Sequence, residues 1–268
     1  MESDTGSPTP GTPAAVPSAA ELQAELLDVP EPPDQPPPVV PPGFEDALAL
    51  ALRHVRGKRG GDLAAVVLVG SGARRAVTPH SDIDLIALVK GAPEGHEIVR
   101  VADRLIDIRY GEYQSVSDEI DRSSRLPPLL RKARILYDHD GIAAKLIEKA
   151  AQRFRQGPPA PTINEQIRWK AECLHWLGKA EDMADKPAVA QYLLQIFFEE
   201  SLTAFFRLRG FWLTAPVDVL RFMSSRDPAL GEMAARFLNS GTIEQRFESA
   251  RQIAAALFKD IPQPARID

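Results

Sequence analysis

The sequence is poor in cysteine and has no long apolar run. Cys173 is the single cysteine among 268 residues, which excludes an intrachain disulfide framework. No stretch of eighteen uninterrupted apolar residues occurs, and the N-terminus has neither basic residues nor the apolar segment of a signal peptide. The sequence therefore predicts a protein of the reducing cytoplasm, with no membrane segment and a reduced thiol at Cys173.

Basic residues are missing from the first part of the chain. Residues 1–42 hold 12 of the 24 prolines and seven acidic residues, with no Lys or Arg, and the net charge of −5 becomes +2 once these seven are left out. Such a segment buries too little apolar surface to offset its ordering entropy. We expect a disordered Pro-rich acidic tail, with a possible short helix at 20–27. Docking of a protein partner and an inert solubilising role are both open for it.

The chain after this tail begins with a helical pattern, followed by strands. Apolar residues recur at helical spacing from Phe44 to Val55, which predicts a helix that ends near residues 57–61. Three apolar runs predict strands buried in a sheet: 63–69, 83–89 and 104–110. Between the second and the third, residues 93–101 favour a crossover helix.

From Gly141 onward the pattern is helical. We expect six helices, at 142–155, 163–184, 188–209, 217–224, 228–238 and 243–258. Aromatic residues at helical spacing are expected in their core, namely Phe197, Phe198, Phe205, Phe206, Phe211 and Trp212. The predicted fold class is α/β (α+β), with a small mixed-sheet domain over residues 43–156 and an all-α helical-bundle domain over residues 157–268.

Two acidic residues flank Ile83 where the second strand begins. Residues i and i+2 of a strand point to the same face, so Asp82 and Asp84 present two carboxylates side by side. Adjacent carboxylates repel unless a proton or a cation lies between them, and their hard oxygen ligands suit Mg²⁺. This pattern predicts a magnesium site, for which Asp107 on the third strand is the candidate third carboxylate and general base.

Gly70 and Ser71 follow the first strand, where a short helix is expected to begin. Free backbone N–H groups and the Ser71 hydroxyl would point at an anion in front of that helix, and a glycine lets a phosphate approach closely. Phosphate oxygens beside a metal pair are the arrangement for in-line attack on phosphorus. A dinucleotide-binding fingerprint and a Walker loop both fail, because Arg75 replaces the third glycine and no Gly-Lys-Ser/Thr follows.

The segment from Val69 to Leu85 resembles the nucleotidyltransferase superfamily of DNA polymerase beta type. The residues that carry the resemblance are Val69-Gly70-Ser71, Ala73-Arg74 and Ser81-Asp82-Ile83-Asp84-Leu85. More weakly, 134–141 and 208–216 resemble stand-alone bacterial members with a C-terminal helical domain, such as kanamycin nucleotidyltransferase. Arg75 stands where many small members have a second glycine, which leaves the local backbone and the substrate fit open.

The resemblance implies a set of roles at this site. It implies that Asp82, Asp84 and Asp107 hold two Mg²⁺ ions, that Asp107 is the base, and that an NTP, with ATP favoured, is the co-substrate. The implied nucleotide-binding residues are Gly70, Ser71, Arg74 and Ser81. A helical domain that holds the acceptor is implied for residues 157–268.

Less specific interpretations remain open for several side chains. Asp107 forms a plain ion pair with Arg109 in one of them, and Asp103 then becomes the reserve ligand. Arg74 is as often a solvated residue of a polar turn as a phosphate ligand. His80 is more typical of a loop than of a metal site.

Glu199 and Glu200 interrupt an apolar run. One of them is expected either to reach the domain interface, where it could orient an acceptor hydroxyl, or to form a salt bridge with Arg207 or Arg209.

Two function hypotheses follow. The first is a Mg²⁺-dependent nucleotidyltransferase that moves a nucleoside monophosphate to an acceptor hydroxyl, with a small-molecule acceptor favoured over nucleic acid. The second is a regulatory or antitoxin-like nucleotide-binding protein that binds or modifies a protein or RNA partner. Turnover with small acceptors would support the first hypothesis, whereas activity with one macromolecule only would support the second.

Overall fold

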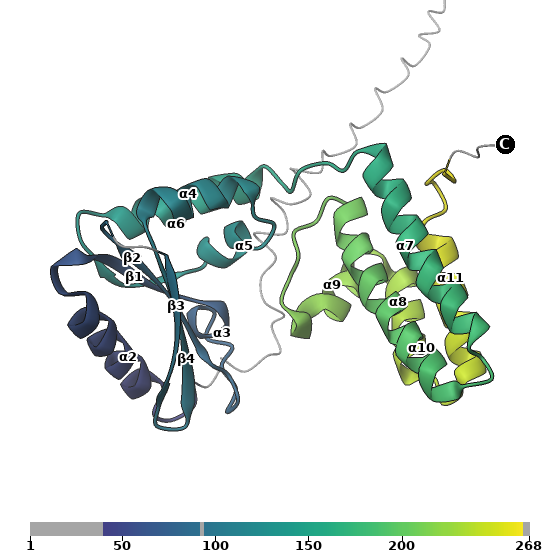
Figure 1. Ribbon diagram of the computed structural model, residues 1–268, viewed down its shortest axis with the longest axis horizontal. Coiled ribbons are helices and arrows are strands. Elements are labelled where there is room, and N and C mark those ends of the chain that lie inside the picture. The colour runs from purple at the N-terminus through teal and green to yellow at the C-terminus, as the bar shows by residue number, and fades with distance from the viewer. Residues whose placement is uncertain (1–39, 92–93, 265–268) are drawn as a thin grey trace, which may run out of the picture.

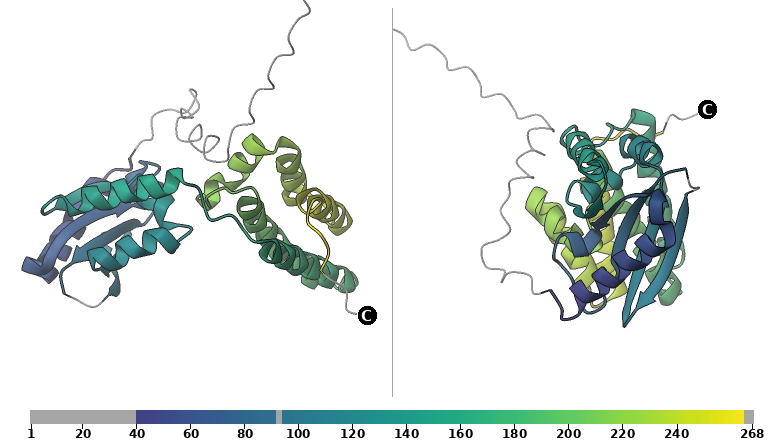
Figure 2. Two further views of the ribbon diagram at one scale, coloured as in Figure 1. Left: turned by 90° about the horizontal axis from the view of Figure 1, so that it is seen from above. Right: turned by 90° about the vertical axis from the view of Figure 1, so that its left-hand side faces the viewer.

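The computed structural model describes residues 40–91 and 94–264. The expected helix at 20–27 and nearly all of the expected tail lie outside these residues. Within the described part of the chain, no helix is long and apolar enough to cross a membrane. Figure 2 shows the sheet-containing part and the helical part side by side.

A mixed five-stranded sheet forms the first part, in the order β3-β4-β2-β1-β5. The strands are β1 (Leu63–Val69), β2 (Ile83–Val89), β3 (Gly95–Val101), β4 (Arg104–Gly111) and β5 (Arg134–Asp138). β2 and β4 run parallel, and the other neighbouring pairs run antiparallel. Every residue of β1 is buried, as expected of a central strand covered on both faces.

Helices cover both faces of this sheet (Figure 1). The first element, α2 (Phe44–Arg59), packs on one face with its apolar stripe, and the 3-10 turn η1 (Gly60–Asp62) leads from it into β1. The helices on the other face are α4 (Tyr113–Arg122), α5 (Leu126–Leu130) and α6 (Ile142–Arg155). The alternation of β1 and β2 side chains divides the apolar residues between these two cores.

The expected helix at 93–101 is wrong, because Gly95–Val101 forms strand β3. Side-chain exposure alternates strictly along it, and Ala102 adopts a φ of +51° in the tight turn to β4. β3 pairs antiparallel with β4 over seven residues. The β-branched residues Ile98, Val99 and Val101 favour a strand over a helix. The connection between the parallel strands β2 and β4 therefore passes through an edge strand.

Helices make up the second part, and their bounds agree with the expected ones within two residues. They are α7 (Ile163–Asp182), α8 (Pro187–Leu208), α9 (Val219–Arg226), α10 (Pro228–Asn239) and α11 (Ile243–Leu257), with a 3-10 turn η2 (Pro216–Asp218) before α9. The Thr162 hydroxyl and the Glu165 carboxylate form a capping box at the start of α7. The predicted fold class is confirmed: a mixed sheet with helices, followed by a helical C-terminal region.

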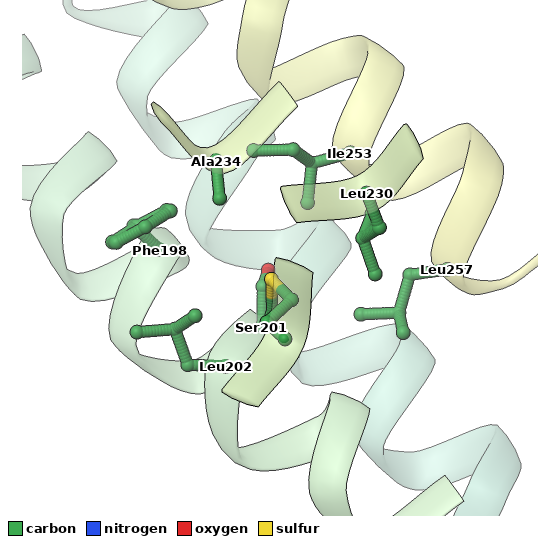
Figure 3. A pocket seen from close by; sticks show the side chains of 8 residues that line it. Phe198, Ser201, Leu202, Leu230, Ala234, Ile253 and Leu257 are labelled. Carbon is green, nitrogen blue, oxygen red and sulfur yellow. The ribbon is translucent and has the colours of Figure 1, made fainter. Parts of the chain in front are cut away.

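Aromatic side chains fill the helical core as expected. Phe198 stacks on Phe237, and the Phe205 ring meets the Phe206 ring edge to face. A small apolar pocket lies between α8, α9, α10 and α11 (Figure 3). Ser201 lies at this pocket, and its Oγ is buried without a hydrogen-bond partner.

Candidate active site

Two carboxylates lie side by side on the face of the sheet that α4 covers further along. Asp84 of β2 and Asp107 of β4 hold the same register in the parallel pair, so both side chains leave the same face of neighbouring strands. Asp82 stands two residues before Asp84, immediately before β2 begins. Burial, together with the negative charges of Asp82 and Asp107, raises the pKa of Asp84 to about 6. The three carboxylates therefore act on one another electrostatically.

The turn after β1 touches this carboxylate group. Gly70 begins the short helix α3 (Gly70–Ala73) with a φ of +67°, and its neighbour Val69 is paired with Asp84 in the sheet. A Cβ atom on Gly70 would lie 2.2 Å from Oδ2 of Asp84. Glycine is therefore required here by backbone conformation and by the close approach of a carboxylate.

Arg75 keeps the backbone conformation that a glycine would favour. Its φ is +57°, in the left-handed region. The Arg75 N–H donates to the Gly72 carbonyl and the Ala76 N–H donates to the Ser71 carbonyl, which closes the turn. The turn therefore forms although arginine stands where glycine was expected. Its backbone is strained at Arg75, because a residue with a side chain is disfavoured in the left-handed region.

Arg74 and Ser81, two expected nucleotide-binding residues, already have partners within the protein. The Arg74 guanidinium donates from Nε to the Gly70 carbonyl at 3.4 Å and from Nη1 to Oδ2 of Asp218 at 3.1 Å. The Ser81 hydroxyl accepts from the Thr78 N–H at 2.9 Å and closes the loop before Asp82. The interpretation of Arg74 as merely solvated is therefore wrong.

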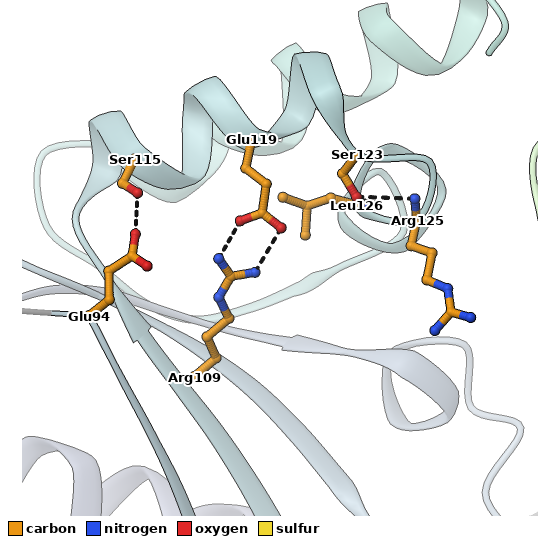
Figure 4. Close-up of polar contacts among 7 residues, drawn as sticks. All are labelled: Glu94, Arg109, Ser115, Glu119, Ser123, Arg125 and Leu126. Carbon is orange, nitrogen blue, oxygen red and sulfur yellow. Dashed lines mark hydrogen bonds and ion pairs between the residues drawn. The ribbon is translucent and has the colours of Figure 1, made fainter. Parts of the chain in front are cut away.

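Asp107 is paired with a histidine that the sequence did not single out. Nε2 of His96 on β3 contacts Oδ1 of Asp107. Arg109 instead forms a bidentate ion pair with Glu119 of α4. The hydrogen bond from Ser115 to Glu94 lies nearby (Figure 4). The alternative ion pair between Asp107 and Arg109 is therefore wrong. Reading residues 95–101 as a strand would have placed His96 on this face.

The other candidates lie outside this group of carboxylates. Asp103 is exposed in the turn between β3 and β4, and His80 is exposed in the loop before β2. In the helical part, the Arg207 guanidinium lies over the Trp169 ring and Arg209 pairs with Asp227, not with a glutamate of α8. Glu199 accepts a hydrogen bond from Gln195 instead.

The carboxylates fit a divalent cation by their chemistry. Within the described residues, no group of three or more His, Cys, Asp or Glu side chains is placed to hold a metal ion, and Asp107 contacts His96. Mg²⁺ is typically held by one or two carboxylates, with substrate phosphates and water as its other ligands, so a closed protein cage is not required. Burial first, and then the negative charges of Asp82 and Asp107, raise the pKa of Asp84, and a bound cation would favour its charged form.

An apolar surface lies next to Asp107. Ile98 of β3 is paired with Asp107 and is 62% exposed, and Leu105 of β4 is 52% exposed on the same face. The exposed Arg100 is paired with Leu105. This part of the sheet face is open to solvent and joins apolar, cationic and acidic side chains.

Comparison with known proteins finds similarity to nucleotidyl-transferring proteins. No protein-family model matches the chain. A protein of Methanocaldococcus jannaschii described as "Putative protein adenylyltransferase" is 28% identical over 130 residues, which cover 44% of this chain and 88% of that protein. The chain is thus similar to that archaeal protein over less than half of its own length. A crystal structure of a nucleotidyltransferase-like protein from Exiguobacterium sibiricum is similar to 79% of this chain and to 74% of its own, with 13% identity and a TM-score of 0.48.

Proposed function

We propose that this protein transfers a nucleoside monophosphate from an NTP, preferably ATP, to an acceptor hydroxyl. The observation that carries the proposal is the shared register of Asp84 and Asp107, with Asp82 and the Gly70 turn at the same end of β2. Carboxylates from two strands then face an anion-binding turn across a short distance. This arrangement suits in-line displacement at phosphorus.

The residues of the site have different roles in this reaction. The acceptor oxygen forms a bond to the α-phosphorus, the bond from that phosphorus to the bridging oxygen breaks, and pyrophosphate leaves. Asp107 takes the acceptor proton, while backbone N–H groups at Gly70 and the Ser71 hydroxyl orient the leaving phosphates. Asp82, Asp84 and Asp107 are the residues that would hold Mg²⁺, which would supply positive charge to offset the phosphate charge.

The acceptor divides into two testable classes. A helical domain beside the site suits a small-molecule pocket, which favours a small hydroxyl compound. A protein acceptor is favoured by the description of the archaeal homologue as a protein adenylyltransferase and by the exposed Ile98 and Leu105 beside Asp107. A flat, open sheet face can admit a large acceptor as well as a small one.

The first test needs no acceptor. We expect one NTP, in the presence of Mg²⁺, to raise the melting temperature, because a ligand that binds the native state stabilises it by mass action. The double variant Asp82→Asn/Asp84→Asn should lose this shift, while Glu232→Gln, an exposed change on α10, should keep it. A melting temperature that no NTP changes would favour the regulatory, partner-binding hypothesis or a nucleotide site that forms only with its partner.

Transfer itself is tested with the α-labelled NTP selected in this way. Asp82→Asn and Asp84→Asn are each expected to reduce label transfer to background without unfolding the protein, because each removes a ligand oxygen at a strand end. The label is followed in a small-molecule fraction and in a protein fraction, which identifies the acceptor class. Full Mg²⁺-dependent transfer by both variants would show that these carboxylates are not the catalytic ones.

A further inference from the structure

The segment between α8 and α9 fastens the helical part to the sheet-containing part at two points. Near its beginning, the Trp212 Nε1–H donates to the Phe154 carbonyl at the end of α6 at 3.0 Å, and the Trp212 and Phe154 rings stack. The Arg153 guanidinium lies over the Trp212 ring at 5.1 Å. Near its end, Asp218 binds Arg74. The residues from Phe211 to Asp218 thus form a strap, visible in Figure 1 as the connection between α8 and α9.

The second attachment point reaches the catalytic turn itself. Oδ2 of Asp218 accepts from Nη1 of Arg74, and Nε of the same guanidinium donates to the carbonyl of Gly70. Gly70 is the residue that lies against Asp84. Oδ1 of Asp218 is held by Arg221 one turn further along. Arg221 therefore fixes the Asp218 carboxylate, and this carboxylate holds the Arg74 guanidinium against the Gly70 turn.

This contact contributes little to stability. The side chains of Arg74 and Asp218 remain 30% and 22% exposed, and ion pairs with this much solvent are worth about 1 kcal/mol or less. Its geometric effect is larger. Nη2 of Arg74 has no hydrogen bond to the residues that the structure describes, so it can still donate. Because Nε and Nη1 are already held, the side chain has less rotamer entropy to lose when an anion binds.

We propose that Asp218 is a positioning residue for the nucleotide site: it holds the Arg74 guanidinium beside the Gly70 turn, so that Arg74 is ready to bind the triphosphate. This inference rests on the proposed function. It also means that the helical part contributes to the donor site through the strap. Because Asp218 acts through Arg74, its removal should weaken NTP binding without abolishing the chemistry.

The test compares NTP binding in four full-length proteins: wild type, Arg74→Ala, Asp218→Ala and the double variant. With the NTP and Mg²⁺ selected above, we expect Asp218→Ala to raise the Kd about threefold to tenfold, which is the effect of one less ordered side chain. Arg74→Ala should raise the Kd at least as much, and the double variant no more than Arg74→Ala alone. KM for the NTP should rise in Asp218→Ala while kcat changes less than twofold.

Two controls separate positioning from structure. Arg209→Gln breaks an ion pair with Asp227 within the helical part and leaves the pair between Asp218 and Arg74 in place. This variant should bind the NTP as the wild type does. Asp218→Asn keeps an oxygen acceptor for Arg74 and should recover much of the affinity.

The outcomes distinguish this inference from the proposed function. A wild-type Kd in Asp218→Ala, or tighter binding caused by release of Arg74 from a competing anion, would overturn the inference and leave the proposed function intact. Additive effects of the two alanine variants would also overturn it. Absence of NTP binding in the wild type would instead overturn the proposed function.

Discussion

At Gly70 the backbone conformation and the proposed catalytic carboxylate Asp84 impose their requirements on the same residue. It combines a φ of +67° with the contact to Asp84, so a larger residue has to change either the turn or the carboxylate. Arg75, five residues further on, shows that the same turn accommodates a side-chain-bearing residue at a φ of +57°. At Gly70 the contact with Asp84 therefore adds to the conformational requirement for glycine.

Gly70→Ala is expected to damage the site more than the fold. The substitution should destabilise the protein by about 1–2 kcal/mol from the positive φ alone, with a further cost from the contact. It should lower nucleotidyl transfer about a hundredfold, because a carboxylate displaced by an ångström is no longer aligned. Urea unfolding and single-turnover transfer measure the two effects.

Gly141→Ala is the matched control for this change. Gly141 has a φ of +71° and no atom within 4 Å of its added Cβ, so it carries the conformational cost without the clash. It should lose about the same 1–2 kcal/mol and keep its transfer rate. Equal activity in the two variants would contradict the role given to the approach of Asp84 to Gly70.

At the scale of elements, the edge strand β3 contributes to both faces of the sheet. His96 and Ile98 belong to the face with Asp107, whereas Glu97 lies on the opposite face, where Lys58 and His54 of α2 and Tyr110 of β4 surround it. The hydrogen bond with Lys58, which has the largest effect, and those with Tyr110 and His54 lower the pKa of Glu97 to about 2. Burial, followed by the hydrogen bond to Glu97, raises the pKa of Tyr110.

Glu97 should therefore make the packing of β3 on α2 sensitive to acid. Its pKa is lower in the folded protein than the ordinary 4.5, so the unfolded chain binds more protons between these values. The stabilisation is fully present above about pH 4.5 and is lost as the pH falls toward 2. Glu97→Gln should lower the free energy of unfolding at pH 7 and flatten its decrease below pH 4.5.

The measurement for Glu97 is urea unfolding at pH 7, 4 and 3. Glu232→Gln on α10 serves as a control for the loss of one exposed carboxylate, and it should follow the wild type. Identical pH profiles for wild type and Glu97→Gln would show that the network with α2 does not stabilise the fold.

At the scale of the whole molecule, the protein has apolar cores on both faces of the sheet and a separate one among the helices. Cys173 belongs to the helical core and is 1% exposed. Burial raises the pKa of its thiol to about 12, while the nearby Ser201 hydroxyl lowers this pKa.

The division at residue 156 into a nucleotidyltransferase domain and a helical acceptor-binding domain stays a prediction.

The thiol of Cys173 should report the opening of the helical core. We expect no reaction with a thiol reagent at pH 8 in the native protein and complete reaction in urea, because both burial and the raised pKa suppress the thiolate. Labelling across a urea titration, compared with far-UV circular dichroism, tests whether the helical core opens together with the sheet. Rapid stoichiometric labelling in buffer would contradict the burial of this side chain.

Sequence reasoning succeeded where a local pattern carries the structural information. The apolar run of β1, the turn at Gly70 and the i, i+2 spacing of Asp82 and Asp84 follow from residues close together in the chain. The helices after Gly141 were likewise predictable from apolar periodicity. Residues 95–101 were misread because a short run of mixed residues satisfies both periods, and pairing with β4 decided the outcome.

By itself, the sequence determined the candidate chemistry: hard carboxylates, a glycine turn and the resemblance to nucleotidyltransferases. Only the tertiary structure decided which side chains meet. The register of β2 with β4 sets Asp107 beside Asp84, β3 brings His96 to Asp107, and the strap brings Asp218 to Arg74 across 144 residues of sequence. Local propensity specifies elements from neighbouring residues, whereas strand register and the docking of separate cores depend on packing between residues far apart in the chain.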